Sequence, residues 1–265
     1  MSVFGRIKQL GPVRKLRRAH YRRYFESANG HALHNGVFRT FEEAAASEPV
    51  SHGFNEASHA SEYEDRRERV FPYDYPILFW LQQIFAGATS LNVVDIGGHV
   101  GVHYYAYGKY LRYPPQLGWL VIEVDAIAKA GRERALRMAA TALEFTTSFE
   151  ALDSHPTDVV LSAGALHYVE RPLLWDTIAR ARTKPVHILL NKVPLYQGED
   201  FVSLQNIGGG FSPHYVWNRE EFVRRFERIG YHLVDDWGVP ERHFELFDDP
   251  GRSFGSYSGL YLRRS

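Results

Sequence analysis

The segment VVDIGGHVG at residues 93–101 constrains the fold of this chain more than any other. Its apolar start is typical of a buried strand, Asp95 stands near the end of that strand, and Gly97, Gly98 and Gly101 follow. Glycine allows unusual backbone angles and a close approach by a ligand, and Gly101 also lets a helix pack tightly on the strand. The segment therefore predicts a strand, a turn and a helix, with a cofactor bound at the turn.

Short apolar runs alternate with helical stretches through the rest of the chain, which is typical of a mostly parallel sheet covered by helices. The first five predicted strands are Asn92–Ile96, Trp119–Glu123, Leu143–Thr147, Asp158–Ala163 and His187–Val193. The predicted helices are Val100–Leu111, Ile127–Ala140, Leu173–Arg182 and 218–230. Two closing strands are predicted at Tyr231–Trp237 and Gly259–Arg263. We expect an α/β fold with a Rossmann-like, seven-stranded, mostly parallel sheet and an N-terminal helical extension.

The N-terminal end is strongly basic. Residues 1–25 contain eight Lys or Arg residues before the first acid, Glu26, and have few apolar positions. This composition favours a mobile or surface helix over a buried one. A helix that is only solvated and an arm that docks onto a membrane surface or a partner protein both fit the pattern.

Further helices are predicted between this arm and the sheet. Residues 36–50 indicate a short helix in which Thr40 caps and Glu43 completes a capping box. Residues 55–86 indicate two more, and the second, at Tyr75–Phe85, has apolar residues at helical spacing. We therefore expect two regions, a basic arm with a helical cap at 1–86 and a cofactor-binding domain at 87–265.

Composition limits the kind of protein further. The 31 basic and 31 acidic residues balance, so no overall field attracts nucleic acid, and no nucleic-acid partner is expected. The absence of cysteine excludes disulfides, thiolate metal sites and a cysteine nucleophile. The sequence contains no evident carboxylate cluster at metal-ligand spacing, and no stretch approaches ~20 apolar residues. We expect a cytoplasmic protein with no metal site.

The glycine turn discriminates between two classes of cofactor. A nicotinamide fingerprint needs three glycines, and aligning Gly98 and Gly101 with it leaves Ile96 in the place of the first. A carboxylate such as Asp95 would repel a pyrophosphate, whereas it would attract the ammonium group of a methionine-like ligand. The turn favours a ligand that is cationic at that end.

A second acid is expected to hold a ribose. Glu123 ends the second predicted strand, 22 residues after Gly101, where nucleotide-binding sheets place an acid that accepts two ribose hydroxyls. Asp125 is the alternative, although it is also positioned to cap the helix that begins near Ala126. We favour Glu123 because it follows the apolar strand directly.

The successive motifs VVDIGGHVG, VIEVD and DVVLSAGALHYVE resemble those of class I S-adenosylmethionine-dependent methyltransferases over residues 91–265. The resemblance implies that S-adenosyl-L-methionine is the cofactor and that Glu123 holds its ribose. It implies that the loop on the methionine side consists of Asp95, Gly97, Gly98 and Gly101. It also implies that Ser162 and Ala163 line the cofactor after the fourth strand.

Two further comparisons concern the methyl acceptor. The stretches GVFRTFEEAAA and HGFNEAS resemble a smaller bacterial group of methyltransferases encoded beside surface-polysaccharide genes, which implies a sugar-containing acceptor. A nucleotide sugar or another small metabolite fits equally. Residues 162–165 read SAGA and lack the Asn/Asp-Pro-Pro-Tyr/Phe motif of enzymes that methylate amino groups of nucleic acids. We expect O-methylation of a small molecule.

The acceptor side is predicted from position alone. His167 directly follows the fourth strand, where its imidazole could act as a general base, although a local hydrogen bond or an adenosine contact also fits. His99 and His103 are weaker base candidates. The segment Pro194–Trp217 is predicted to be a long loop that closes over the site, although a flexible surface insertion also fits. Within it, His214 and Tyr215 are candidate acceptor-binding residues.

Three functions therefore remain open from the residues. The first is a methyltransferase acting on a small-molecule or sugar-containing acceptor. The second is an inactive subunit that binds the cofactor and supports a partner. The third is a nicotinamide-dependent sugar oxidoreductase, which the turn at residues 96–101 favours least.

Overall fold

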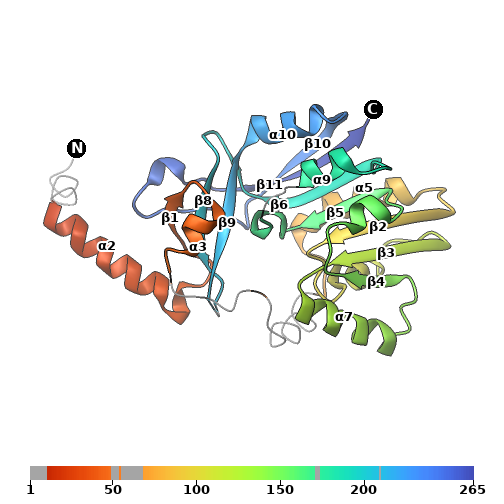
Figure 1. Ribbon diagram of the computed structural model, residues 1–265, viewed down its shortest axis with the longest axis horizontal. Coiled ribbons are helices and arrows are strands. Elements are labelled where there is room, and N and C mark those ends of the chain that lie inside the picture. Colours follow the sequence, from red (N-terminus) through yellow and green to blue (C-terminus); the bar gives the residue numbers. More distant parts are fainter. Residues whose placement is uncertain (1–10, 49–53, 55–67, 171–173, 209) are drawn as a thin grey trace.

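The computed structural model describes residues 11–48, 54, 68–170, 174–208 and 210–265. A seven-stranded sheet and a four-stranded sheet lie side by side (Figure 1). The larger sheet has the order β10-β11-β6-β5-β2-β3-β4, in which the strands from β6 to β4 run parallel and β11 and β10 add antiparallel at one edge. The predicted α/β fold with a Rossmann-like, mostly parallel sheet is confirmed.

The strands of the larger sheet lie close to the predicted runs. Their bounds are β2 Ser90–Ile96, β3 Gln116–Ile122, β4 Leu143–Thr146, β5 Val159–Ala163, β6 His187–Val193, β10 Tyr231–Val239 and β11 Tyr257–Arg264. After β2 the chain builds β3 and β4 on one side and then β5 and β6 on the other. Ligands of such sheets bind outside the carboxyl ends of the strands where the order reverses. The expected site therefore lies beside the end of β2.

Helices cover both faces of this sheet because neighbouring residues of each strand point to opposite faces. On β2, Val93 packs with helices α5, α6 and α7, whereas Val94 packs with α8, α9 and α10. The bounds are α5 Tyr75–Phe85, α6 Val102–Tyr107, α7 Asp125–Arg137, α8 Ala151–Ser154, α9 Leu174–Arg180 and α10 Arg219–Glu227. The predicted helices at these places are confirmed, with shorter limits for α6 and α10.

The four-stranded sheet corrects the prediction of a long loop at Pro194–Trp217. The segment contains β7 Leu195–Tyr196, β8 Phe201–Asn206 and β9 Phe211–Asn218. β8 and β9 are antiparallel, and between them the Ile207 N–H donates to the Gly210 carbonyl at 2.9 Å. Every residue of β8 is buried. The prediction of a structureless lid is therefore wrong, because the segment forms paired strands whose apolar residues are mostly buried.

The N-terminal region supplies the fourth strand of this sheet as well as helices. β1, His34–Phe38, pairs antiparallel with β8. The predicted short helix follows as α3, Phe41–Ala45, and Thr40 caps it by accepting a bond from the Glu43 N–H at 3.1 Å. The cap is thus not purely helical, and the division at residue 86 stays a prediction. The other helix predicted within 55–86 falls mainly in 55–67, outside the described residues.

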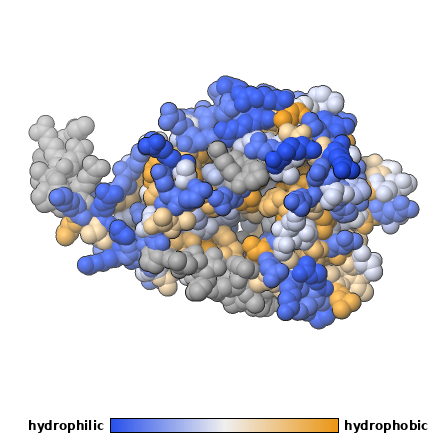
Figure 2. Space-filling model, in the orientation of Figure 1, coloured by the Kyte–Doolittle hydropathy of each residue, from blue (hydrophilic) through white to orange (hydrophobic). Residues whose placement is uncertain are grey.

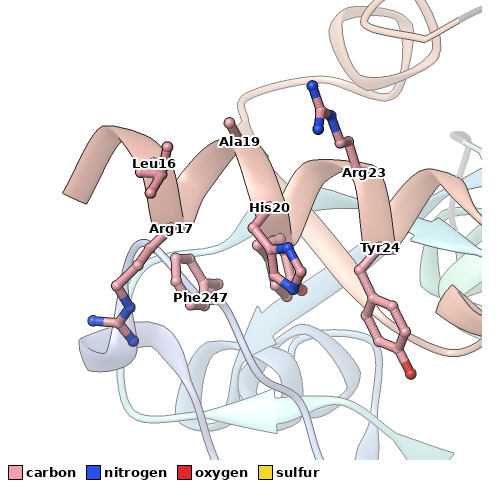
Figure 3. A pocket seen from close by; sticks show the side chains of 8 residues that line it. Leu16, Arg17, Ala19, His20, Arg23, Tyr24 and Phe247 are labelled. Carbon is pink, nitrogen blue, oxygen red and sulfur yellow. The ribbon is translucent and has the colours of Figure 1, made fainter. Parts of the chain in front are cut away.

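The basic arm forms helix α2, Gly11–Glu26, which extends away from the rest of the molecule (Figure 1). Leu16 is 76% exposed, which confirms a surface helix. One side of α2 rests on Phe247, whose ring stacks on Tyr21 at 4.7 Å, and Arg18 pairs with Asp248 at 2.8 Å. Figure 3 shows the groove between them, lined by Phe247 and by Leu16, Arg17, Ala19, His20, Tyr21, Arg23 and Tyr24.

Contact of α2 with a membrane or a partner protein stays a prediction. Within the described ranges, no helix is long and apolar enough to cross a membrane.

Candidate active site

The predicted glycine turn joins β2 to α6 at the carboxyl edge of the sheet. Gly97 and Gly101 have φ of +73° and +85°, in the left-handed region that favours glycine. A Cβ on Gly97 would collide with the side chain of Ala165, and one on Gly101 would lie 2.6 Å from the side chain of Leu143. A Cβ on Gly98 would collide with the carboxylate of Asp95 beneath it. All three glycines are required for the turn to pack.

Asp95 is fully buried beneath this turn. Its Oδ2 lies 3.0 Å from Nδ1 of His103 and accepts a bond of 3.2 Å from the indole N–H of Trp119. The sequence predicts that this carboxylate binds the ammonium of a methionine-like ligand directly, but in the structure none of its atoms is exposed. In this arrangement Asp95 supports the turn, and His103 orients Asp95 rather than facing an acceptor.

Glu123 follows β3 directly, beside the turn. Gly97 N–H donates to the Ile122 carbonyl at 2.9 Å, so the turn and the end of β3 are joined. Oε1 of Glu123 accepts a bond of 3.1 Å from the backbone N–H of His99, and Oε2 accepts one of 2.9 Å from that of Val124. Burial raises the pKa of Glu123, and the two backbone N–H groups partly oppose this shift. The side chain is held in place yet remains partly exposed.

The role expected for Asp125 as a helix cap is wrong. α7 already includes Asp125, its N-cap is Val124, and no side chain caps it. Asp125 lies exposed in the first turn, where an acid complements the positive end of the helix dipole. Asp125 therefore lies one helical position beyond the cap, and Glu123 is the acid next to the glycine turn.

His99 belongs to the turn in a way that the sequence did not indicate. Its φ is +54°, an uncommon backbone conformation for a residue with a side chain. Its N–H points at Glu123, as described above. The backbone of His99 therefore belongs to the turn, and its role as a base stays a prediction.

The end of β5 supplies Ser162 and Ala163, both buried. Ser162 Oγ donates to the Ile96 carbonyl at 3.1 Å, which ties β5 to β2 at the edge of the site. The chain then turns through Gly164, with φ of +107°, and passes Ala165 next to Gly97. The predicted lining residues thus lie next to the glycine turn, although the Ser162 hydroxyl is used within the protein.

Three buried histidines lie next to this turn of the chain. His167 is in the short helix η3, Leu166–Tyr168, and its ring centroid is 4.4 Å from that of His214 on β9. The ring of His34 on β1 lies 4.7 Å from that of His214. Burial lowers the pKa of all three, that of His214 to about 3, so the rings are neutral near pH 7. We call these three residues the histidine cluster.

Each ring of the histidine cluster has a buried nitrogen without a hydrogen-bond partner. These atoms are Nε2 of His34, Nδ1 of His167 and Nδ1 of His214. The other nitrogen of His214, Nε2, lies 3.2 Å from the Tyr257 hydroxyl. Buried polar atoms in native proteins usually have partners, so three such atoms in one place indicate a site for a ligand or ordered water. Among the described residues, no group of three or more histidines or acids is arranged to hold a metal ion.

The structure brings His167 and His214 together and separates Tyr215 from them. Tyr215 lies on the opposite face of β9, where it stacks on Trp217 at 5.4 Å and contacts Phe41 at 5.0 Å. His34 was missed, because only the pairing of β1 with β8 brings it to this place and no local sequence pattern signals that pairing.

The two sheets frame the candidate site. The carboxyl ends of the parallel strands point toward the four-stranded sheet (Figure 1), and η3 contacts β9 there. Figure 2 shows that this face of the molecule is hollowed near its centre, between the two sheets. The glycine turn and Glu123 therefore lie on one side of the site, and the histidine cluster lies toward the four-stranded sheet.

No protein-family model matches the sequence, and no curated protein matches it. Solved structures do match the fold. A magnesium protoporphyrin IX methyltransferase from Synechocystis with bound S-adenosylmethionine is 13% identical, with a TM-score of 0.50 over 93% of this chain and 96% of that chain. This likeness agrees with the Rossmann-like fold that the strand order shows.

Two other methyltransferase structures give slightly lower scores. The 1,6-didemethyltoxoflavin-N1-methyltransferase of Burkholderia thailandensis is 14% identical, with a TM-score of 0.49 over 82% of this chain and 92% of that chain. The CcbJ methyltransferase of Streptomyces caelestis is 15% identical, with a TM-score of 0.49 over 78% of this chain and 96% of that chain.

Proposed function

We propose that this chain is an S-adenosylmethionine-dependent methyltransferase that acts on a small molecule. The observation that carries the proposal is the contact between the glycine turn and Glu123, in which the His99 N–H donates to Oε1 at 3.1 Å. It places an acid and a glycine turn together at the point where the strand order reverses, as a nucleoside cofactor requires. The fold is shared with a methyltransferase whose structure holds S-adenosylmethionine.

The residues present fit this cofactor. Gly97 and Gly98 allow the shape of the turn, because a Cβ at either position would collide with Ala165 or Asp95. The backbone of this turn would face the methionine part, while Glu123 would accept the ribose hydroxyls. When bound, S-adenosylmethionine supplies an electrophilic methyl group on a sulfonium. Asp95 would support the turn from beneath, because it lies against Gly98 and is itself held by His103 and Trp119.

His167 is the proposed general base for a hydroxyl acceptor. Its Nδ1 is buried and has no partner, and burial keeps the ring neutral, so this atom can accept a proton. The loop that contains His167 passes Gly97 at Ala165, and this contact supports a base near the cofactor turn. Correct alignment of the acceptor can contribute on the order of 7–11 kcal/mol, and a base adds about 10²–10⁴-fold to the rate.

O-methylation and a sugar-containing acceptor remain the finer part of the proposal. The resemblance to the group encoded beside surface-polysaccharide genes has no match among family models or curated proteins. We therefore propose a small-molecule acceptor with a hydroxyl group and treat sugars as one class to be tried.

Mass spectrometry tests the proposal. The full chain is incubated with S-adenosylmethionine and panels of sugars, nucleotide sugars and hydroxylated small acids, and the products are weighed. A gain of one methyl group in one acceptor, with release of S-adenosylhomocysteine, is expected. Binding of S-adenosylmethionine without transfer to any acceptor would favour the inactive partner subunit instead.

A further inference from the structure

The geometry points to an acceptor that carries an anionic group, a carboxylate or a phosphate, bound by the histidine cluster together with Lys192 and Arg242. The inference rests on the proposed function, because it identifies the acceptor end of the same site. It depends on three observations: the unpartnered nitrogens of the histidine cluster, the unusual backbone around Lys192, and the placement of Arg242.

Lys192 is held in a strained conformation at the end of β6. Its φ is +55°, in the left-handed region, which costs a lysine energy that a glycine would not lose. The side chain passes over Gly164, where an added Cβ would lie 2.9 Å from Cε of Lys192. Gly164 has φ of +107° and lies on the strand exit next to β6, since Ala163 pairs with Asn191. The left-handed backbone at the ends of β5 and β6 thus allows the side chain of Lys192 to lie across the site.

Further contacts fix Lys192 in this place. Its backbone N–H donates to Oδ1 of Asn191 at 3.0 Å, and the buried Asn191 side chain also donates to the Tyr73 carbonyl at 2.8 Å. Nζ of Lys192 lies 4.9 Å from the centre of the Tyr73 ring. Strain of this kind persists only where the surroundings enforce it, and it is concentrated at functional sites. The ammonium is therefore positioned rather than left to solvent.

Arg242 lies near the histidine cluster. Its carbonyl accepts a bond of 2.9 Å from the N–H of Tyr257, whose hydroxyl contacts His214. The side chain is partly buried, and within the described part of the chain it makes no ion pair. Its charge acts on both His167 and Tyr257.

The charges around His167 have one sign. Apart from burial, the influences on the pKa of His167 come from His214, His34, Lys192 and Arg242, and all four lower it. Two cations beside three neutral, buried rings form a place where a negative charge is favourable. An anion could accept charge-assisted bonds from both cations, and imidazole N–H groups of His34 and His214 could donate to its remaining oxygens.

The test measures anion binding without methyl transfer. Full-length protein labelled with ¹⁵N at histidine is titrated with benzoate, phenyl phosphate and benzamide, and imidazole ¹⁵N shifts are followed by NMR. Lys192→Gln and Arg242→Gln are compared with Arg112→Gln, which changes an exposed arginine elsewhere. Thermal unfolding of each variant checks that it is folded.

We expect benzoate or phenyl phosphate to shift the resonances of the histidine cluster, and benzamide to leave them in place. Affinity for the anion should fall at least about tenfold in Lys192→Gln and in Arg242→Gln, and stay unchanged in Arg112→Gln. If one of the two anions binds more tightly than the other, that difference identifies the preferred anionic group as well. Equal shifts with benzamide, no shift with either anion, or unchanged affinity in both folded variants would overturn the inference.

The two proposals fail separately. S-adenosylmethionine binding is measured by calorimetry on the same samples. If the protein binds the anion but not S-adenosylmethionine, the methyltransferase function is rejected and the anion site still stands. Cofactor binding without anion binding would reject only the anionic acceptor.

Discussion

The rings of His167 and His214 have centroids 4.4 Å apart, although His167 follows β5 of the seven-stranded sheet and His214 lies on β9 of the four-stranded sheet. The smaller sheet therefore forms a wall of the candidate site. An acceptor bound between the sheets would contact the loop after β5 and the side chains of β9 at once.

Replacing His167 should separate catalysis from cofactor binding. His167→Ala is expected to lower turnover by about 10²-fold or more while cofactor affinity stays nearly unchanged, because the ring is proposed to act on the acceptor proton. Steady-state kinetics with an identified acceptor and calorimetry with S-adenosylhomocysteine measure the two effects. His232→Ala, at an exposed position on β10, is the control.

The pH profile adds a second readout for this residue. Burial lowers the pKa of His167 well below 6.5, so the base should stay unprotonated and turnover should not decline on its account between about pH 8 and about pH 6. Full turnover in His167→Ala would return the ring to a packing role, and lost cofactor affinity would place it beside the adenosine.

Stability should depend on pH through the histidine cluster. In the folded protein the pKa of His214 is lowered by burial to about 3, from an ordinary value of 6.5. The unfolded chain therefore binds more protons between these two values, and the free energy of unfolding should fall as the pH drops below about 6.5. The part of the free energy of unfolding that depends on a neutral His214 is fully present only above about pH 6.5.

His214→Phe should reduce this dependence. The wild-type protein is expected to lose on the order of 2 kcal/mol more than the variant between about pH 7.5 and about pH 5, since one buried group no longer titrates. Urea unfolding at both pH values measures the difference, and only the change with pH is compared because the variant also loses its contact with Tyr257. His232→Phe, at an exposed site, should keep the wild-type slope; an equal slope in His214→Phe would contradict the assignment.

The glycine turn can be tested by adding a single methyl group. Gly98→Ala should lower the free energy of unfolding by about 1–3 kcal/mol and weaken cofactor binding at least about tenfold, because the new Cβ collides with the Asp95 carboxylate. Gly255→Ala is a matched control, since nothing lies within 4 Å of the position of its Cβ. Calorimetry and urea unfolding provide the two measurements. Unchanged cofactor binding in Gly98→Ala would show that cofactor binding does not depend on the shape of this turn.

The large sheet and its cofactor turn could be predicted because their signals are local. An apolar strand, a glycine turn and a helix follow one another within 93–101, and Glu123 stands at the end of the next apolar run. What the sequence could not show is the use of Asp95. Its partners His103 and Trp119 reach it only in the folded chain, where they turn an expected ligand contact into a support for the turn.

The four-stranded sheet was missed because its strands contain signals that normally indicate loops. The hairpin turn has three glycines in a row, and Pro213 interrupts the apolar pattern of β9. Proline is tolerated there because β7 pairs only with Trp217 and Asn218, which leaves β9 as an edge strand near Pro213. The distant pairing of β1 with β8 then brings His34 to the histidine cluster, and no local pattern predicts it.

Calorimetric titration with S-adenosylmethionine and with NAD tests the central claim most directly. We predict that the wild-type chain binds S-adenosylmethionine and its demethylated product, and binds NAD far more weakly. Glu123→Ala should weaken cofactor binding by about 1–3 kcal/mol, since ribose hydroxyls lose a charged acceptor, and Asp125→Ala should have a smaller effect. Tight binding of NAD with no measurable binding of S-adenosylmethionine would contradict the proposed methyltransferase function.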